Sequence, residues 1–397
     1  MKEIKIYEFF SGMGSQLKAL KNIATSNDIC VKSVGACEWY INAIIAYLKI
    51  HYGELKPETE LTKEQMIEIL KNYSFSANSK TLVSETYFRR NRKLSEIFPY
   101  LYAFVNNDYF NKVYKTNKEF ENYTDITKVD SLKSEIDILT YSFPCQDISS
   151  QGLKRGITKE TRSGLLYEIE RIIKNSTKRP KILLLENVKN LVSKKFINDF
   201  KKWIEVLDEL GYETSFKVLN ASDFGSAQNR ERVFAVSVLR ENNHTFDFDS
   251  LIKLNDKKLY EIVKTENSGV DLSYILEKCK VSKITTSRNG LRKANLLNYS
   301  NFNSENRIYL NTAKVGPTLI ASNRLKFYFP EINKLRYINS KEAFLYMGFS
   351  ENDYEKVKKQ NLISETRLTF LCGNSISVEV LESIFSGIIN YIKEKND

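Results

Sequence analysis

The sequence has very little histidine, few cysteines, and little proline or glycine. Of its 397 residues only 2 are His, 5 are Cys, 6 are Pro and 15 are Gly. His51 and His244 leave almost no material for a Ser-His-Asp triad or a multi-histidine metal site, so we expect no metal. The low proline and glycine counts exclude a collagen-like or low-complexity chain. Any chemistry must therefore depend on Cys, Glu, Asp and Arg side chains.

The five cysteines show no pairing pattern. Their number is odd, and none of them forms a Cys-x-x-Cys pair. This disfavours a disulfide framework and a zinc ribbon, and it favours a reducing, cytoplasmic environment. The N-terminus, MKEIKIYEFF, has no signal-peptide core, and no run approaches the roughly 18 apolar residues of a membrane span. We therefore expect no membrane partner.

Basic residues are in surplus, with 60 Lys and Arg against 49 Asp and Glu and a formal net charge of +11. Such a surplus favours a polyanionic partner. Many basic residues lie between positions 278 and 326, where Glu305 is the single acidic residue and Tyr299, Phe302 and Tyr309 are interspersed. One interpretation of this run is a solvated basic surface. The other is a face that binds nucleic acid through phosphate and aromatic contacts.

Short apolar runs alternate with helical patterns over the first 240 residues. The runs that predict strands are 4–10, 34–37, 136–142, 181–188 and 232–239. Residues 164–174 and 196–211 have helical periodicity, and Gly211 suits a position just past a helix end. The alternation predicts an α/β fold with a doubly wound, mainly parallel sheet.

Breaks in this alternation predict the domain organisation. We expect a catalytic and cofactor-binding domain over 1–239, a smaller mixed domain with the basic run over 240–335, and a return to the first domain over 336–397. Residues 51–124 are polar, rich in aromatics and contain RRNRK at 89–93. We interpret them as a mostly helical insertion.

Two motifs near the N-terminus favour a cofactor that contains adenosine. FFSGMGS (9–15) places Gly12 and Gly14 between a strand and a helix, where backbone amides can approach a cofactor. A tight strand-to-helix connection would explain these glycines equally well. Glu38 ends the second predicted strand and can accept hydrogen bonds from ribose hydroxyls, with Trp39 beside it. An exposed glutamate at a strand end is the alternative.

Two further motifs present a thiol and a carboxyl group after buried strands. SFPCQD (142–147) holds Cys145 behind a proline, where a thiolate can act as a nucleophile. A buried structural thiol is the alternative. LLLENV (183–188) ends in Glu186, whose pKa desolvation raises, so that it can donate a proton or hydrogen bond. A carboxylate that caps a nearby helix is the alternative.

A third motif, QNRER (228–232), sets Arg230 and Arg232 two residues apart on the next strand. They suit an anion or a carbonyl oxygen, or else structural ion pairs. We expect all of these sites to lie at the carboxyl ends or edges of parallel strands, where open α/β sheets bind ligands.

The order FSGMGS, EW, PCQ, ENV, QNRER and GNS resembles the bacterial DNA cytosine-5 methyltransferases over nearly the whole chain. The resemblance implies a Rossmann-like methyltransferase fold with a smaller DNA-recognition domain. It implies transfer of a methyl group from S-adenosyl-L-methionine to carbon 5 of a cytosine flipped out of double-stranded DNA. It further implies a cytoplasmic, nucleoid-associated monomer that serves a restriction-modification system beside a separate endonuclease, or an orphan methylase.

The resemblance also assigns roles to residues at the matching motif positions. It implies that Cys145 adds to carbon 6 of cytosine, that Glu186 holds ring nitrogen 3, and that Arg230 and Arg232 support the active site. The implied cofactor contacts are Phe10, Gly12, Gly14, Glu38, Trp39, Asp125, Ile126, Leu165 and Asn374, of which Asn374 is assigned to the last helix.

Candidate DNA contacts and the recognition sequence are less constrained. The candidates are Gln146, Ser149, Arg288, Arg292, Ser304, Asn306, Thr318 and Ser322. Since the base must leave the duplex, we expect a mobile loop over 147–163. The chain most resembles CpG methyltransferases of mollicutes, but its run at 322–324 is shorter than their polar loop. CpG and another short motif both stay open.

Three other functions account for fewer of the motifs. A nicotinamide-dependent dehydrogenase would use the glycines and Glu38 but would not need PCQ, ENV or QNRER. A zinc deaminase needs Pro-Cys-x-x-Cys, and residue 148 is Ile. A DNA-binding protein without catalytic activity would carry an inert Cys145.

Overall fold

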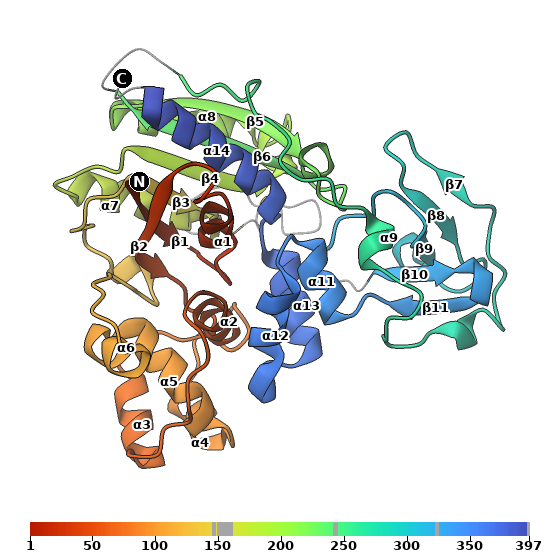
Figure 1. Cartoon of the computed structure of the whole chain (residues 1–397), viewed down its shortest axis with the longest axis horizontal. Coiled ribbons are helices and arrows are strands. Elements are labelled where there is room, and N and C mark those ends of the chain that lie inside the picture. The colour runs from red at the N-terminus through yellow and green to blue at the C-terminus, as the bar shows by residue number, and fades with distance from the viewer. Residues whose placement is uncertain (145–147, 149–161, 241–244, 322–324, 395–397) are drawn as a thin grey trace.

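The computed structural model of the chain describes residues 1–144, 148, 162–240, 245–321 and 325–394. It contains a six-stranded sheet with helices on both faces and a five-stranded sheet that stands apart at the right of Figure 1. A group of short helices lies at the lower left of Figure 1, and a cluster of C-terminal helices lies between the two sheets.

The first sheet has the strand order β2-β1-β3-β4-β6-β5. Its strands are β1 (Lys2–Phe9), β2 (Ile29–Cys37), β3 (Ile138–Tyr141), β4 (Ile182–Val188), β5 (Tyr212–Asn220) and β6 (Glu231–Leu239). Strands β2, β1, β3 and β4 are parallel. The five strands expected from the apolar runs and the mainly parallel α/β sheet are therefore confirmed.

The sequence analysis missed β5 and misjudged the direction of β6. Strand β5 lies at the edge of the sheet, and most of its side chains are partly or fully exposed, so it has no continuous apolar run. It forms an antiparallel pair with β6, which is also antiparallel to β4. Arg230 and Arg232 therefore lie at the amino end of β6, not at the carboxyl end of a parallel strand. They still lie at the same edge of the sheet as Glu186 because β6 runs antiparallel to β4.

Helices cover both faces of this sheet. On one face lie α1 (Ser15–Asn22), α2 (Ile41–His51) and α14 (Val378–Glu394), and on the other lie α7 (Leu166–Asn175) and α8 (Ile197–Glu209). Strand β1 shows the division, since Ile4 and Ile6 pack on the first face and Tyr7 and Phe9 on the second. Gly211, with φ +87°, follows α8 as expected.

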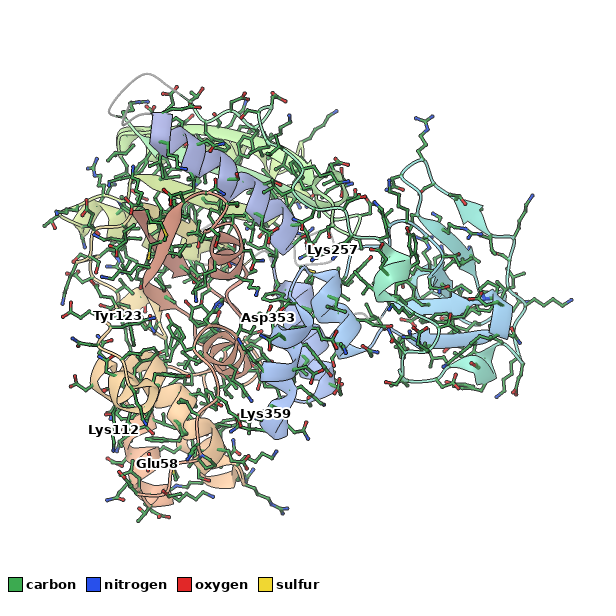
Figure 2. The ribbon with its side chains drawn as sticks, in the orientation of Figure 1. Glu58, Lys112, Tyr123, Lys257, Asp353 and Lys359 are labelled. Carbon is green, nitrogen blue, oxygen red and sulfur yellow. The ribbon has the colours of Figure 1, made fainter. Side chains whose placement is uncertain are left out.

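The segment 51–124 contains four helices beside α2. They are α3 (Lys63–Leu70), α4 (Glu85–Arg90), α5 (Leu94–Val105) and α6 (Asn107–Tyr114). Aromatic side chains form much of their common core, among them Phe98, Tyr102 and Tyr109, whose rings lie 4.7 to 6.0 Å apart. Glu58 accepts a hydrogen bond from the Tyr109 hydroxyl at 2.8 Å (Figure 2).

The second sheet has the order β11-β10-β9-β8-β7. Its strands are β7 (Thr285–Thr286), β8 (Arg292–Asn295), β9 (Arg307–Leu310), β10 (Lys326–Phe329) and β11 (Lys334–Tyr337), accompanied by α9 (Leu259–Ile262) and α10 (Asn303–Asn306). Its own core consists of Leu272, Ile275, Ala294, Leu296, Ile308 and Leu335. Flanking residues such as Phe246, Phe248 and Leu319 pack into the core of the first sheet.

The chain then returns through α11 (Ser340–Tyr346), α12 (Glu351–Lys358), α13 (Glu365–Asn374) and α14. Ion pairs tie this region to the rest, with Lys18 2.9 Å from Asp353 and Lys359 2.7 Å from Glu54 (Figure 2). Asn374 ends α13, so its expected place in the last helix is wrong. A short break at 375–377, in which Ser377 bonds to Glu379, separates α13 from α14.

By length and composition the stretch Glu365–Glu394 is apolar enough to cross a membrane. However, 83% of its apolar window is buried inside the protein, as in the core helix of a globular fold.

The short 3₁₀ helices are Ile126–Lys128, Arg162–Leu165, Lys189–Val192, Ala221–Phe224, Ser273–Ile275, Pro330–Ile332 and Lys359–Asn361.

Candidate active site

Strands β3 and β4 bring the Pro-Cys and Glu-Asn-Val motifs side by side. Tyr141, the last residue of β3, pairs with Leu185 of β4, so the chain leaves the sheet at the same level as Glu186. The Asn187 amide donates a hydrogen bond to the Phe143 carbonyl at 3.1 Å, and Asn190 donates one to the Ile148 carbonyl. These two amides therefore hold the chain on both sides of Cys145, which itself lies outside the described residues.

The roles of Asn187 and Asn190 were not foreseen from the sequence. Asn187 is 2% exposed, and its oxygen also accepts from the Val188 N–H at 2.8 Å. A buried amide needs partners on its polar atoms, and here the cysteine-containing segment supplies one. The signal was present in the letters ENVKN, where two polar amides follow an apolar strand.

Glu186 and Arg232 form a nearly buried ion pair at the carboxyl end of β4. The Arg232 Nε lies 3.2 Å from Glu186 Oε1, and Glu186 is 8% exposed. Burial raises the pKa of Glu186 above its ordinary value, against the positive charges of Arg232 and Arg230, which lower it. A carboxyl group in this condition can hold a proton and pass it to a ring nitrogen.

Arg230 makes a different set of contacts from Arg232. Its guanidinium is buried and donates to the carbonyls of Leu319 at 2.7 Å, Ser375 at 2.8 Å and Gly373 at 3.2 Å. Glu231, between the two arginines, bonds instead to the Lys189 ammonium at 2.8 Å. Arg230 thus joins the start of β6 to two distant segments of the chain. Its guanidinium also lies close enough to Glu186 to lower the pKa of that carboxyl group.

The segment 316–321 lies directly beside the QNRER motif. Gly316 exchanges backbone hydrogen bonds with Ala227 and Asn229, at 2.8 and 2.9 Å. The Gln228 side chain accepts from the Leu319 N–H at 2.9 Å. A Cβ on Gly373 would come within 2.4 Å of the Ala321 nitrogen, which explains the glycine of the GNS motif. The chain up to residue 321 is therefore held beside the start of β6.

The two glycines of the first motif have different surroundings. Both have positive φ angles, +56° for Gly12 and +78° for Gly14. A Cβ on Gly12 would meet no atom within 4 Å, whereas a Cβ on Gly14 would lie 2.3 Å from His51 Nε2. Gly12 therefore faces open space, while packing against His51 is enough to explain Gly14. Phe10, half-buried, also has a positive φ of 56°.

Glu38 is fixed by backbone amides on both oxygens. Oε2 accepts from the Gly12 N–H at 2.9 Å, and Oε1 accepts from Trp39 and Tyr40 at 2.9 and 2.8 Å. Burial raises the pKa of Glu38, and these three hydrogen bonds oppose that rise. The carboxylate thus links the glycine turn to the end of β2, and Oε2 keeps further acceptor capacity for a hydroxyl group.

Asp125 and Ile126 lie close to Glu38 because residues 121–123 run parallel to the end of β2. The Glu38 N–H donates to the Tyr123 carbonyl at 3.0 Å. Asp125 Oδ1 accepts from the Thr127 N–H and hydroxyl at 3.1 and 2.7 Å. Ile126 is buried, Leu165 is half-buried at the end of its 3₁₀ helix, and Asn374 is exposed at the end of α13.

A buried polar cluster under the glycine turn was also missed. Glu8 of β1 is fully buried and accepts from the Tyr47 hydroxyl at 2.9 Å and from the Leu17 N–H at 3.1 Å. Burial raises the pKa of Glu8 to about 7. His51 Nε2 lies 3.0 Å from the Gly14 carbonyl oxygen, and burial lowers the pKa of His51. The sequence signal was one glutamate within the apolar strand IKIYEFF.

The candidate DNA contacts fall into three groups. Arg288 is exposed in the turn between β7 and β8, Ser304 is exposed on α10, and Arg292 of β8 donates to the Thr312 hydroxyl at 2.6 Å. Asn306 closes a turn through two hydrogen bonds with Ser300, and Thr318 donates to the Asn229 carbonyl at 2.6 Å. Gln146, Ser149 and Ser322 lie outside the described residues, as does most of the predicted loop 147–163.

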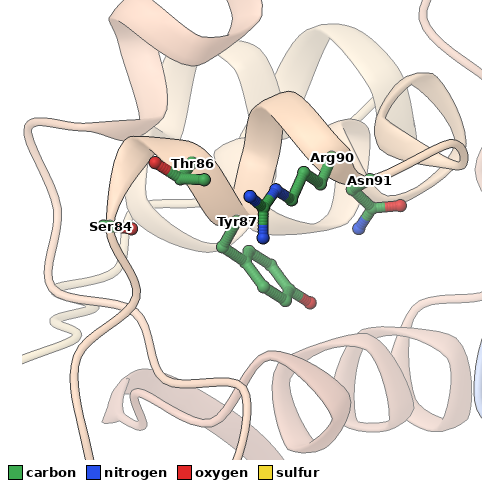
Figure 3. Close-up of a pocket in the computed structure, with 5 residues that line it drawn as sticks. All are labelled: Ser84, Thr86, Tyr87, Arg90 and Asn91. Carbon is green, nitrogen blue, oxygen red and sulfur yellow. The ribbon is translucent and has the colours of Figure 1, made fainter.

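A surface pocket of about 400 Å³ lies elsewhere, beside α4 (Figure 3). Its lining is Ser84, Thr86, Tyr87, Arg90 and Asn91. None of these residues lies at the strand ends that hold the candidate site. Among the described residues no group of three or more His, Cys, Asp or Glu side chains gathers as a metal site would.

Comparison with known proteins extends over nearly the whole chain. The model of the C-5 cytosine-specific DNA methylases matches residues 89–390. The orphan methyltransferase M.SssI of Spiroplasma monobiae is 39% identical over 402 residues, covering 98% of this chain and 97% of the relative. The type II methyltransferase M2.ScrFI of Lactococcus lactis subsp. cremoris is 32% identical, covering 96% and 98%. The Dnmt2 methyltransferase of S. pombe has a similar fold, with a TM-score of 0.59, 14% identity and coverage of 98% and 99%.

Proposed function

Because the chain belongs to the C-5 cytosine-specific DNA methylases, we propose how its own residues carry out methyl transfer to cytosine in DNA. The observation that carries the proposal is the buried pair Glu186–Arg232 beside a segment held by Asn187. It puts a carboxyl group of raised pKa beside the end of β3, the strand that precedes Cys145 in the chain. Buried, prearranged charges of this kind stabilise charge that develops on a substrate.

In the proposed mechanism, the Cys145 thiolate adds to carbon 6 of a flipped-out cytosine while Glu186 gives a proton to ring nitrogen 3. This converts the ring to an enamine with a nucleophilic carbon 5. S-adenosyl-L-methionine supplies the methyl group that carbon 5 takes up. The carbon 5 proton then leaves to solvent, the thiolate departs, and the proton on nitrogen 3 returns to Glu186. Arg232 holds Glu186 in place, and Arg230 joins the segments that surround the site.

The residues at the ends of β1 and β2 fit the adenosine part of the cofactor. Glu38 is held by three amides and can accept from ribose hydroxyls, with Trp39 beside it. Gly12 faces open space, and the half-buried Phe10 just before it is the proposed ring that stacks on the adenine. Asp125 has acceptor capacity for the adenine amino group. The remaining proposed contacts are Gly14, Ile126, Leu165 and Asn374.

We assign DNA recognition to residues 240–335 and catalysis to residues 1–239 and 336–397. Arg292 on β8, Arg288 in the turn before it and Ser304 on α10 suit contacts with DNA because their side chains are partly or fully exposed. The protein is proposed to be a cytoplasmic, nucleoid-associated monomer that methylates one short motif, CpG by its resemblance. Its role is that of an orphan methylase or of the modifying partner of a separate endonuclease.

Bisulfite sequencing of plasmid DNA from cells that express the chain tests this proposal. We expect cytosines in one short motif to resist conversion, and we expect this protection to vanish in Cys145→Ser. Methylation of every CG would establish CpG recognition, whereas a longer motif would exclude it. A soluble wild-type protein that protects no cytosine would instead favour a DNA-binding protein without catalytic activity.

A further inference from the structure

Part of the segment 51–124 contacts the residues of the proposed cofactor site. The residues between α3 and α4 reach the carboxyl end of β2, where the Ser76 N–H donates to the Trp39 carbonyl at 2.8 Å. The Ile41 N–H donates in turn to the Ser76 carbonyl at 2.9 Å. Ser76 therefore forms an isolated parallel bridge with Tyr40 and holds the chain that follows Glu38.

Ser74, two residues before Ser76, bonds to Asp125, which is the second acidic residue of the proposed cofactor site. Its N–H donates to the Thr124 hydroxyl at 3.1 Å, and its own hydroxyl donates to Asp125 Oδ2 at 3.3 Å. The Lys128 ammonium donates to the same hydroxyl oxygen at 3.3 Å. Because an ammonium group can only donate, the Ser74 oxygen acts as its acceptor and the Ser74 proton is directed toward Asp125.

The helices of the segment hold residues 74–76 in place. Phe75, between Ser74 and Ser76, is 1% exposed and packs edge-on against Phe88 of α4, with 6.2 Å between ring centres. The Ser76 hydroxyl donates to the Thr81 carbonyl at 2.7 Å. Tyr123 lies where these helices meet the first sheet (Figure 2). The loop is therefore anchored from the helical side and bonded to the cofactor side.

We propose that Ser74 is a positioning residue that directs the Asp125 carboxylate toward the amino group of the cofactor's adenine. The helical segment 51–124 holds Ser74 in the place where it can do so. Thr127 bonds to one Asp125 oxygen and Ser74 to the other, so the carboxylate cannot rotate without losing a hydrogen bond. The acceptor position that remains on Oδ2 then faces a fixed direction. This inference rests on the proposed cofactor role of Asp125.

Calorimetric binding of two product analogues to the full-length protein tests the proposal. S-adenosylhomocysteine carries the adenine amino group, and S-inosylhomocysteine has a carbonyl oxygen in its place. In Ser74→Ala we expect affinity for S-adenosylhomocysteine to fall about fivefold, the effect of one lost hydrogen bond. We expect affinity for S-inosylhomocysteine to stay unchanged, so discrimination between the two narrows.

Two variants serve as controls. Ser74→Thr keeps the hydroxyl and should retain most of the discrimination. Ser84→Ala removes an exposed hydroxyl of the same segment that caps no helix through its side chain, and it should change neither affinity. Equal weakening of both ligands by Ser74→Ala would show a merely structural role and overturn the inference, as would no change in either. A wild-type protein that binds neither ligand would overturn the proposed function as well.

Discussion

The two sheets present their candidate residues in opposite ways. At the edge of the first sheet, Glu186, Arg230 and Asn187 are nearly buried, and each has partners from other segments. Beside the second sheet, Arg288 in the turn between β7 and β8 and Ser304 on α10 are both exposed. The first arrangement suits one reaction carried out in one geometry. The second suits binding to a polyanion through separate contacts, each of which can form or break without the others.

This difference sets the size of the effects that single substitutions should have. A buried, charged group with fixed partners leaves an unpaired charge or lost proton donor when it is replaced. An exposed basic residue loses one screened contact with a phosphate. We therefore expect large, specific effects at the first sheet and small, additive effects at the second.

The largest effect is expected for Glu186→Gln. The amide keeps the shape and can still accept from Arg232, but it cannot give a proton to ring nitrogen 3. We expect kcat for methyl transfer to fall by about a hundred- to a thousandfold, with KM for S-adenosylmethionine nearly unchanged. Initial rates with radiolabelled cofactor would measure this. If kcat stayed within a factor of three, the contrast between the two sheets would lose its main support.

A smaller effect, on stability, is expected for Glu8→Gln. The pKa of Glu8 rises from 4.5 to about 7 on folding, so the folded protein holds an extra proton between those values. The stability that this proton contributes is complete below pH 4.5 and is lost as pH rises to about 7. Glutamine keeps partners for Tyr47 and Leu17 without ionising.

Denaturant unfolding of wild type and Glu8→Gln at pH 5 and pH 8 would measure the difference. We expect similar free energies of unfolding at pH 5 and a gain of about 1–2 kcal/mol for the variant at pH 8. An equal difference at both pH values would mean that Glu8 does not titrate in this range in the folded protein.

The smallest effect is expected for Arg292→Ala on the second sheet. Its Nη1 bonds only to the Thr312 hydroxyl among the contacts described for it, and the side chain is partly exposed. We expect DNA affinity to fall about threefold and the slope of log affinity against log salt to fall by about one. Titrations of fluorescent duplex DNA at several salt concentrations would show this.

Lys112→Ala is the matched control for that measurement. Lys112 is an exposed cation on α6 that pairs with Glu60 at 3.0 Å, in the helical segment and not on the second sheet (Figure 2). It should leave both the affinity and the salt slope unchanged. A loss as large as that of Arg292→Ala would mean that net charge alone, and not the second sheet, governs DNA binding.

Much of the fold was readable from local patterns. The apolar strands β1, β3, β4 and β6 and the helices α7 and α8 are visible because buried segments carry a continuous apolar run or stripe. Strand β5 was not visible, since an edge strand needs few apolar residues. The direction of β6 was not visible either, because a strand's residue pattern is the same in both directions.

The candidate site divides in the same way. The order of PCQ, ENV and QNRER already indicated the family, because these letters report the chemistry that each strand end must supply. The different contacts of Arg230 and Arg232 were not visible, since the partners of Arg230 lie 89 to 145 residues away in the chain. The cluster of Glu8, Tyr47 and His51 was hidden for the same reason.

Local sequence thus establishes the elements of this protein and the chemical groups at their ends, because backbone periodicity and side-chain chemistry are properties of neighbouring residues. Its folding in three dimensions establishes which groups share an environment. Long-range packing buries Glu186 beside Arg232, leaves open space next to Gly12, and brings Ser74 of the helical segment to Asp125. Burial and partner geometry govern a carboxylate's pKa and its orientation, and both arise only when distant segments pack together.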